Sequence, residues 1–124
     1  MENIMGNGNP KISVEYTEKA TIAVLTDEKI LEEDDIQALE KSLMPLVSQT
    51  SGINLIIDFS NVRFFSSAVL GLLIRVSKRI NESDGRLKLC SIDSQIYEIF
   101  KITRLDTIFD ICDDQQKAIR SLKY

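Results

Sequence analysis

The chain has 124 residues, 44% of them hydrophobic, which suits one domain with a buried core and is too short for two. Its formal net charge is -4, whereas a protein that binds the phosphate backbone of a nucleic acid needs a basic surface. We therefore expect no nucleic-acid partner.

No segment of the sequence predicts membrane insertion or export. The longest apolar stretch, residues 68–74, is far shorter than the roughly 20 residues that a membrane-spanning helix needs. The first ten residues lack both the basic start and the apolar core of a signal peptide. These features predict a cytoplasmic protein with no membrane insertion.

Residues 1–10 predict a flexible N-terminal tail, because they are rich in Gly and Asn and hold too little apolar surface to order themselves. Residues 11–124 are predicted to form the domain. Two short runs of β-branched and apolar residues, Ile12–Tyr16 and Thr21–Leu25, predict an opening hairpin. Apolar residues then recur at helical spacing and predict a first helix that ends near Ser48.

The middle of the chain predicts a strand, a loop and a second helix. The apolar run Ile53–Ile57 ends at Asp58 and is typical of a strand buried on both faces. Residues 59–65 are expected to form a loop. Apolar positions from Val69 to Ile80 predict the second helix, with Gly85 as its natural stop.

The last third predicts shorter elements. Residues 87–89 alternate between apolar and charged and indicate a strand, residues 96–100 a brief helix, and residues 108–111 an edge strand. Asp113 and Gln116 have the spacing of a capping box that begins a last helix. Strands that alternate with helices predict an α/β fold, with a mixed β-sheet of four to five strands covered by about four helices.

Ser66 and Ser67 open the second predicted helix. Its first turn offers unpaired N–H groups and the positive end of the helix dipole, so a serine there can cap the helix or carry a phosphate. A phosphate adds about -1.5 to -2 charges, which changes the surface for a docked partner. For Ser66 we favour capping. For Ser67, an ordinary first-turn serine and a functional one both remain open.

The residues around this pair resemble the STAS domain family, and especially the bacterial anti-sigma factor antagonists. Asp58 matches the aspartate that ends the family's strand, and Ser66-Ser67 matches the serine pair that opens its helix. Glu32 aligns with an acidic residue that the family places near the phosphorylation site. The likeness extends from about residue 11 to residue 122.

The resemblance implies a STAS fold and a regulatory protein-binding module without enzymatic activity or cofactor. It makes Ser67 the phosphoacceptor, an anti-sigma factor or serine kinase the partner, and a phosphatase a further candidate partner. We predict that the partner contacts Glu32, Asp58, Ser66, Ser67 and Arg75. Arg75 lies on the outer face of the second predicted helix, where it meets an acidic partner or is simply solvated.

Two departures from the family pattern keep a second function open. Phe65 stands where the family has an acidic residue before the serine pair, and Ala68 stands where it has a glycine. The alternative is therefore a non-phosphorylated STAS scaffold or accessory subunit of a signalling or transport assembly. An enzyme is the least favoured reading, because the chain has no histidine, P-loop or dinucleotide-binding fingerprint.

Three other features have simpler explanations than a reactive site. The acidic residues between 27 and 35 lack the EF-hand pattern, and we attribute them to the helix dipole rather than to a metal. Asp58 is better explained as a turn-forming or capping residue than as a catalytic carboxylate. Cys90 and Cys112 are far apart in the sequence and are expected to be buried, unreactive thiols.

Overall fold

The computed structural model describes residues 11–122, so the predicted tail and residues 123–124 lie outside the described part. The main sheet has five strands in the order β1-β2-β4-β6-β7, with β1 antiparallel to β2 and the other neighbours parallel. The predicted α/β class, the mixed sheet and the number of helices are confirmed.

The strands of the main sheet are β1 (Ile12–Tyr16), β2 (Thr21–Leu25), β4 (Asn54–Asp58), β6 (Arg86–Cys90) and β7 (Asp110–Cys112). A second sheet holds β3 (Lys29–Ile30) and β5 (Phe64–Phe65). The helices are α1 (Glu33–Gln49), α2 (Ala68–Glu82), α3 (Ser94–Ile102) and α4 (Gln115–Arg120), with a 3-10 turn η1 (Leu105–Thr107).

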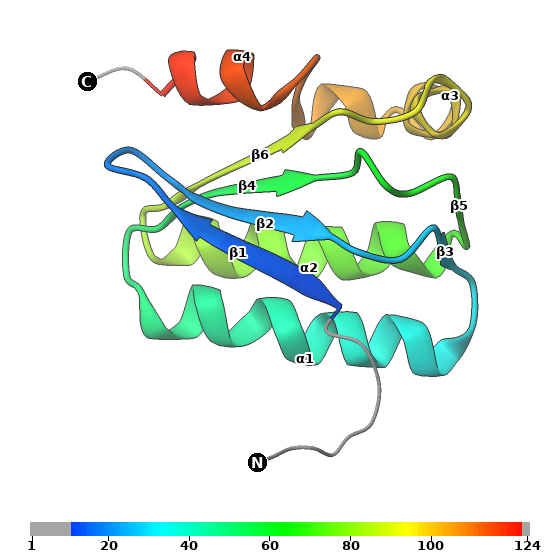
Figure 1. Cartoon of the computed structure of the whole chain (residues 1–124), viewed down its shortest axis with the longest axis horizontal. Coiled ribbons are helices and arrows are strands. Elements are labelled where there is room, and N and C mark those ends of the chain that lie inside the picture. The colour runs from blue at the N-terminus through cyan, green and yellow to red at the C-terminus, as the bar shows by residue number, and fades with distance from the viewer. Residues whose placement is uncertain (1–10, 123–124) are drawn as a thin grey trace.

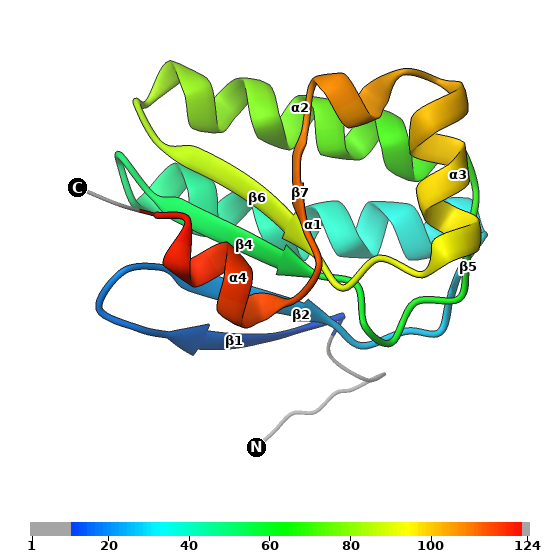
Figure 2. The same cartoon turned by 90° about the horizontal axis from the view of Figure 1, so that it is seen from above.

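Helices cover the main sheet on both faces. α1 and α2 lie side by side below the sheet (Figure 1), and α4 lies above it, over β4 in the view from above (Figure 2). Leu55 and Ile57 of β4 belong to the large core between the sheet and helices α1 and α2, whereas Ile56 packs in a smaller cluster with Ala118 of α4. β4 is therefore buried on both faces, as its unbroken apolar run predicted.

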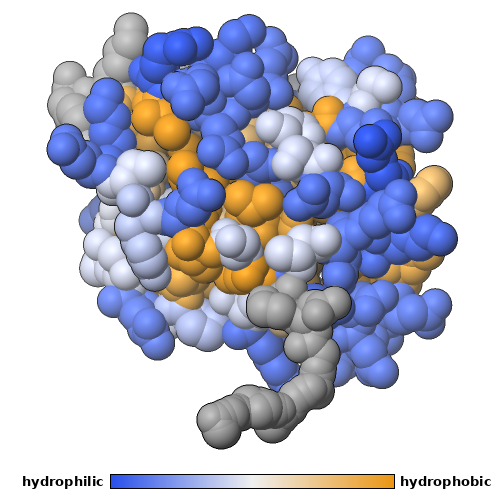
Figure 3. Space-filling model, viewed as in Figure 1, coloured by the Kyte–Doolittle hydropathy of each residue, from blue (hydrophilic) through white to orange (hydrophobic). Residues whose placement is uncertain are grey.

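The core reaches the surface along the edge strand β1. In Figure 3, apolar side chains show in the middle of the face seen in Figure 1, and hydrophilic side chains surround them. Ile12 of β1 and Met44 of α1 are partly buried against the core. Because β1 is the last strand on this side, no further element covers its outer edge within residues 11–122.

The small β3–β5 sheet was not predicted from the sequence. Residues 59–65 were expected to form a loop, yet Phe64 and Phe65 pair in parallel with Lys29 and Ile30. Strands of two residues are too short to show a period of two. This sheet ties the segments before α1 and α2 together, so both helices begin at the same end of the molecule, on the right of Figure 1.

Glycine has a different role after α2 than predicted. The residue in the left-handed conformation is Asp84, with φ of 63°, one position before Gly85. A Cβ added at Gly85 would lie 2.4 Å from the backbone oxygen of Ile53. Gly85 is therefore required by the close approach of two backbone segments rather than by a positive φ.

The capping residue of α4 is also one position away from the prediction. Asp114, not Asp113, precedes the helix, and its carboxylate accepts a hydrogen bond from the Lys117 N–H at 2.9 Å. Asp113 instead pairs with the Lys117 ammonium group. The predicted edge strand is shifted in the same direction, to Asp110–Cys112.

Candidate functional site

The first turn of α2 separates the roles of its two serines. The Ser66 hydroxyl accepts a hydrogen bond from the Ala68 N–H at 3.2 Å, and the Ser66 carbonyl accepts one from the Val69 N–H at 3.0 Å. The Ser66 hydroxyl therefore bonds the first N–H of α2, as its predicted capping role requires, although the residue directly before the helix is Ser67, whose side chain makes no capping bond. Ser67 is exposed, and its side chain makes no hydrogen bond to any of residues 11–122.

The start of α1 is built from carboxylates. Glu33, Asp34 and Asp35 occupy the first turn, where the helix dipole stabilises negative charge. The Glu32 N–H donates a hydrogen bond to the Asp35 carboxylate at 3.2 Å, and this bond is the main reason that the pKa of Asp35 is lowered. The helix-dipole explanation therefore fits Glu33, Asp34 and Asp35, whereas Asp27 lies before this turn and pairs with Lys11.

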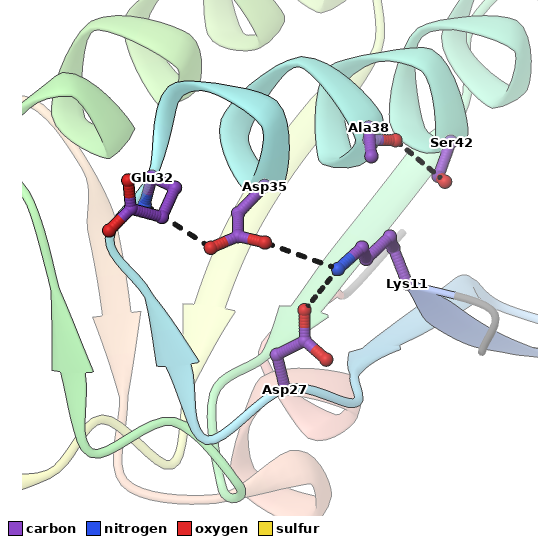
Figure 4. Close-up of polar contacts among 6 residues, drawn as sticks. All are labelled: Lys11, Asp27, Glu32, Asp35, Ala38 and Ser42. Atoms are coloured by element: carbon purple, nitrogen blue, oxygen red, sulfur yellow. Dashed lines mark hydrogen bonds and ion pairs between the residues drawn. The ribbon is translucent and has the colours of Figure 1, made fainter. Parts of the chain in front are cut away.

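Lys11 fastens the beginning of the sheet to this helix start. Its ammonium group lies 2.7 Å from a carboxylate oxygen of Asp27 and 3.6 Å from one of Asp35, and Figure 4 shows it between the two. These contacts, above all the hydrogen bond to Asp27, raise the pKa of Lys11. The network fixes α1 relative to β1, while Glu32 itself remains exposed.

The β3–β5 sheet brings the starts of α1 and α2 next to each other. Ile30 is paired with Phe65, and the Ser66 N–H donates a hydrogen bond to the Ile30 carbonyl at 3.0 Å. Glu32 and Ser67 each follow two residues after that pair. Three of the predicted contact residues, Glu32, Ser66 and Ser67, therefore share one end of the molecule.

Two large apolar side chains at this end were missed by sequence reasoning. Leu31 is 46% exposed and Phe64 is 49% exposed. Both lie in the short segments that enter the helices, where an apolar residue is usually assigned to the core. The sequence signal that could have revealed the exposure of Phe64 was its position beside a second phenylalanine. Phe65 points inward and contacts Phe100. Phe64 points outward, with the Lys29 ammonium group over its ring.

Arg75 lies further along α2 and is paired within the chain. Its guanidinium group donates two hydrogen bonds to the Glu40 carboxylate of α1, at 2.9 and 3.3 Å. Eight residues along a helix correspond to about 12 Å, so Arg75 lies two turns away from Ser67. The arginine therefore joins the two helices and still exposes 53% of its side chain.

Asp58 is separated from the other predicted contacts. It is 3% exposed, accepts a hydrogen bond from the Ser60 N–H at 2.7 Å and another from the Gln115 side chain of α4. Its interpretation as a turn-forming aspartate is confirmed. The carboxylate lies on the α4 side of the sheet, away from the starts of α1 and α2.

The two cysteines differ in exposure. Cys90 is fully buried, and burial raises the pKa of its thiol to about 12, with a further contribution from the Asp58 carboxylate. Cys112 on the neighbouring strand is only partly buried. The prediction that both thiols are buried was correct for Cys90 and wrong for Cys112.

Among residues 11–122, no three His, Cys, Asp or Glu side chains lie close enough together to form a metal-binding group. None of the helices in the same range has the length and apolar character needed to span a membrane.

Comparison with known proteins identifies the family. The model of the STAS domain matches residues 14–118. The chain belongs to the STAS domain family. This confirms the resemblance seen in the sequence, and STAS anti-sigma antagonists are generally non-enzymatic.

Two related proteins are anti-sigma factor antagonists. The anti-sigma-B factor antagonist of Bacillus subtilis (strain 168) is 33% identical over 82 residues, which cover 66% of this chain and 73% of that protein. The putative anti-sigma factor antagonist BtrV of Bordetella bronchiseptica is 26% identical over 68 residues. That match covers 55% of this chain and 59% of BtrV, so it spans less than two thirds of the relative.

Solved structures show the same fold. An anti-sigma-factor antagonist (STAS) domain protein from Planctomyces limnophilus superposes with a TM-score of 0.83 at 22% identity, covering 94% of this chain and all of that one. SpoIIAA of Bacillus in its phosphorylated form superposes with a TM-score of 0.67 at 16% identity, covering 90% of this chain and 99% of that one. These likenesses establish the STAS fold of the chain.

Proposed function

We propose that this STAS domain is an anti-sigma factor antagonist that binds an anti-sigma factor with serine kinase activity, and that phosphorylation of Ser67 switches the complex off. The observation that carries the proposal is the exposed hydroxyl of Ser67, directly before α2, which makes no hydrogen bond to any of residues 11–122. Its relatives are anti-sigma factor antagonists, and one protein of the same fold is known in a phosphorylated form.

The electrostatics of the helix start support such a switch. A phosphate on Ser67 lies at the positive end of the α2 dipole, so it costs the fold little. The neighbouring start of α1 already carries Glu32 and three carboxylates in its first turn. Adding about -1.5 to -2 charges beside them makes this end strongly negative, which disfavours a partner that docks on the neutral serine.

The proposed docking surface consists of Glu32, Ser66, Ser67 and the exposed Leu31 and Phe64. The two apolar side chains provide the area that a partner can bury, and the polar residues surround it.

Two predicted contacts lie outside this surface. Arg75 lies about two helical turns from Ser67, and its pairing with Glu40 leaves part of the guanidinium group accessible to a partner that extends along α2. For Asp58 we propose an indirect role, because its carboxylate holds the loop that leads to α2 rather than facing a partner.

Phosphorylation and binding can be tested together. The protein is incubated with ATP and, in turn, each anti-sigma serine kinase encoded in its source genome, and intact mass and complex formation are recorded. We expect one kinase to bind the unmodified chain and to transfer one phosphoryl group to it. Ser67→Ala should abolish the modification and Ser66→Ala should retain it. The absence of both a complex and a mass change would refute the proposal.

The scaffold alternative rests on Phe65. Its ring lies 6.3 Å from the ring of Phe100, so the position that is acidic in the family serves here to pack α3 against the β3–β5 sheet. If the chain is a non-phosphorylated scaffold or accessory subunit, Ser67→Asp leaves partner binding unchanged and Ser67 is never modified in cells. Peptide mapping of protein purified from cells decides between the two functions.

A further inference from the structure

The two cysteines of the chain lie directly across from each other on neighbouring strands. Cys90 is the last residue of β6 and Cys112 is the last residue of β7, and the parallel register of these strands pairs the two positions. Neighbouring strands lie about 4.8 Å apart, within the range of roughly 4.4–6.8 Å that separates the Cα atoms of a disulfide. Both thiols are free in the structure. The fold therefore brings together two oxidisable groups that are far apart in the sequence.

The side chains of the two cysteines point to the same face of the sheet. Residues paired in register on neighbouring strands share a face, and both cysteines pack in the cluster that includes Ala118 of α4. Two positions earlier on this face, the Lys88 ammonium group forms an ion pair with the Asp110 carboxylate. Side chains at paired positions of β6 and β7 thus already meet across this face.

The Cys90 thiol is protected and close to its partner. Burial raises the pKa of this thiol to about 12, and the Asp58 carboxylate and the Cys112 sulfur add to the effect. The contribution from Cys112 is a second sign that the two sulfurs are neighbours. Because the thiolate is the reactive form of cysteine, Cys90 does not start a reaction by itself.

Cys112 is the thiol that a small oxidant reaches first. It is partly buried, whereas Cys90 is fully buried. Cys112 lines a hollow of about 320 Å³, whose wall also includes Ser94 and Tyr97 of α3. A water molecule occupies about 30 Å³ in the liquid, so a molecule of the size of hydrogen peroxide fits in this hollow.

We propose that Cys90 and Cys112 are a redox-sensitive pair that forms a reversible disulfide bond when the chain meets a peroxide. The Cys112 thiolate attacks one peroxide oxygen: an S–O bond forms, the O–O bond breaks, and the departing hydroxide takes up a proton to become water. The Cys90 sulfur then attacks the Cys112 sulfenic acid: the S–S bond forms, the S–O bond breaks, and the Cys90 proton leaves with the hydroxyl as water. Two thiols are oxidised and one peroxide is reduced to two waters. The inference does not depend on binding to an anti-sigma factor.

The bond constrains the edge of the sheet. β7 has three residues, and the segment between the cysteines contains α3 and η1. Closing this segment into a loop reduces the freedom of the unfolded chain, so the oxidised protein should melt about 5–15 °C above the reduced protein. A lower midpoint after oxidation means that the bond strains the strands, and it overturns the claim that the fold already holds the two thiols in place.

The main test oxidises the reduced chain with hydrogen peroxide under native conditions. Remaining thiols are then alkylated in denaturant, and intact mass and peptide maps are recorded. We expect a monomer that has lost two hydrogens, carries no alkyl group and joins the Cys90 and Cys112 peptides, and that dithiothreitol returns to the dithiol. Three results overturn the proposal: alkylation of both thiols, an oxidised Cys112 beside a free Cys90, or a product that joins two chains.

Single variants test the order of the two steps. In Cys90→Ser, Cys112 is expected to stop at the sulfenic acid, which dimedone captures with an increase in mass. In Cys112→Ser, Cys90 is expected to stay a free thiol at the same peroxide dose, because it is buried. Equal oxidation of the two variants overturns this order. If circular dichroism shows that the buried hydroxyl of Cys90→Ser unfolds the chain, Cys90→Ala takes its place.

A shifted thiol tests the register. In the double variant Ile111→Cys/Cys112→Ser, the second thiol moves by one residue along β7, to the face of the sheet that packs against the larger core. We expect no disulfide with Cys90 in this variant, although the chain still holds two cysteines. A disulfide that forms as readily as in the wild type shows that the bond does not need the paired register, and it overturns the structural basis of the proposal.

Discussion

Two polar sites close in sequence differ completely in their surroundings. Ser67, directly before α2, is exposed, and its hydroxyl makes no hydrogen bond within residues 11–122. Asp58, at the end of β4, is 3% exposed and accepts hydrogen bonds through both carboxylate oxygens. The chain crosses from the α4 side of the sheet to the α1–α2 side between them. A residue that is free can change its chemistry without cost to the fold, and a residue that is bonded cannot.

The largest effect is expected at the exposed site and on binding alone. Ser67→Glu should weaken binding to the kinase about a hundredfold, equivalent to about 2.7 kcal/mol, because it places a charge in the docking surface. Its denaturant midpoint should stay at the wild-type value, since Glu is favourable in a first helical turn. Titration calorimetry measures the binding affinity, and urea unfolding measures the stability. A lower stability of Ser67→Glu would contradict the contrast between Ser67 and Asp58.

The buried site should respond in the opposite way. Asp58→Ala leaves the Ser60 N–H and the Gln115 amide without their acceptor, so the free energy of unfolding should fall by about 2 kcal/mol. Urea unfolding measures this loss. Gln115→Ala serves as a control that removes only one of the two bonds, and it should cost less. Equal stability of Asp58→Ala and wild type would show that the carboxylate is not held as described.

Between these extremes lies the capping serine. Ser66→Ala removes the acceptor of the Ala68 N–H and should cost about 1 kcal/mol of stability. Ser67→Ala is the matched change one residue later, and it should leave the thermal midpoint nearly unchanged. If the two alanine variants melt together, the assignment of distinct roles to the serines fails.

The smallest effect concerns the start of α1. The pKa of Asp35 is lowered mainly by the hydrogen bond from the Glu32 N–H, so its stabilising contribution is present above the ordinary carboxyl pKa of about 4. It is lost as the pH falls through the lowered pKa of the folded state. Wild type should therefore be more stable than Asp35→Asn at pH 7, and the difference should shrink under acid. Urea midpoints of both proteins across this range provide the check.

Features that depend on neighbouring residues were predicted well. The hairpin strands Ile12–Tyr16 and Thr21–Leu25 have the predicted bounds, and α1 ends one residue after the predicted Ser48. Ser66 caps α2 as expected. Periodicity and capping act over a few residues, so the sequence records them directly.

The errors come from competition between similar local signals. Asp113 and Asp114 are both good capping residues. The position at which β7 ends decides which of the two carboxylates accepts the hydrogen bond from the Lys117 N–H. Gly85 was assigned to a helix stop because glycine is common there, but its requirement comes from Ile53, far away in the chain. Such ambiguities shift an element by a residue without changing the fold.

The sequence by itself determined the α/β class, the order of the principal elements and the serine pair at the start of α2. Only the tertiary structure decided that Glu32 and Ser67 lie at one end, because the two-residue strands β3 and β5 pair across more than thirty residues. It likewise buried Asp58 under Gln115 of α4. Local patterns encode helices and strands, whereas exposure depends on which distant segments pack against each residue.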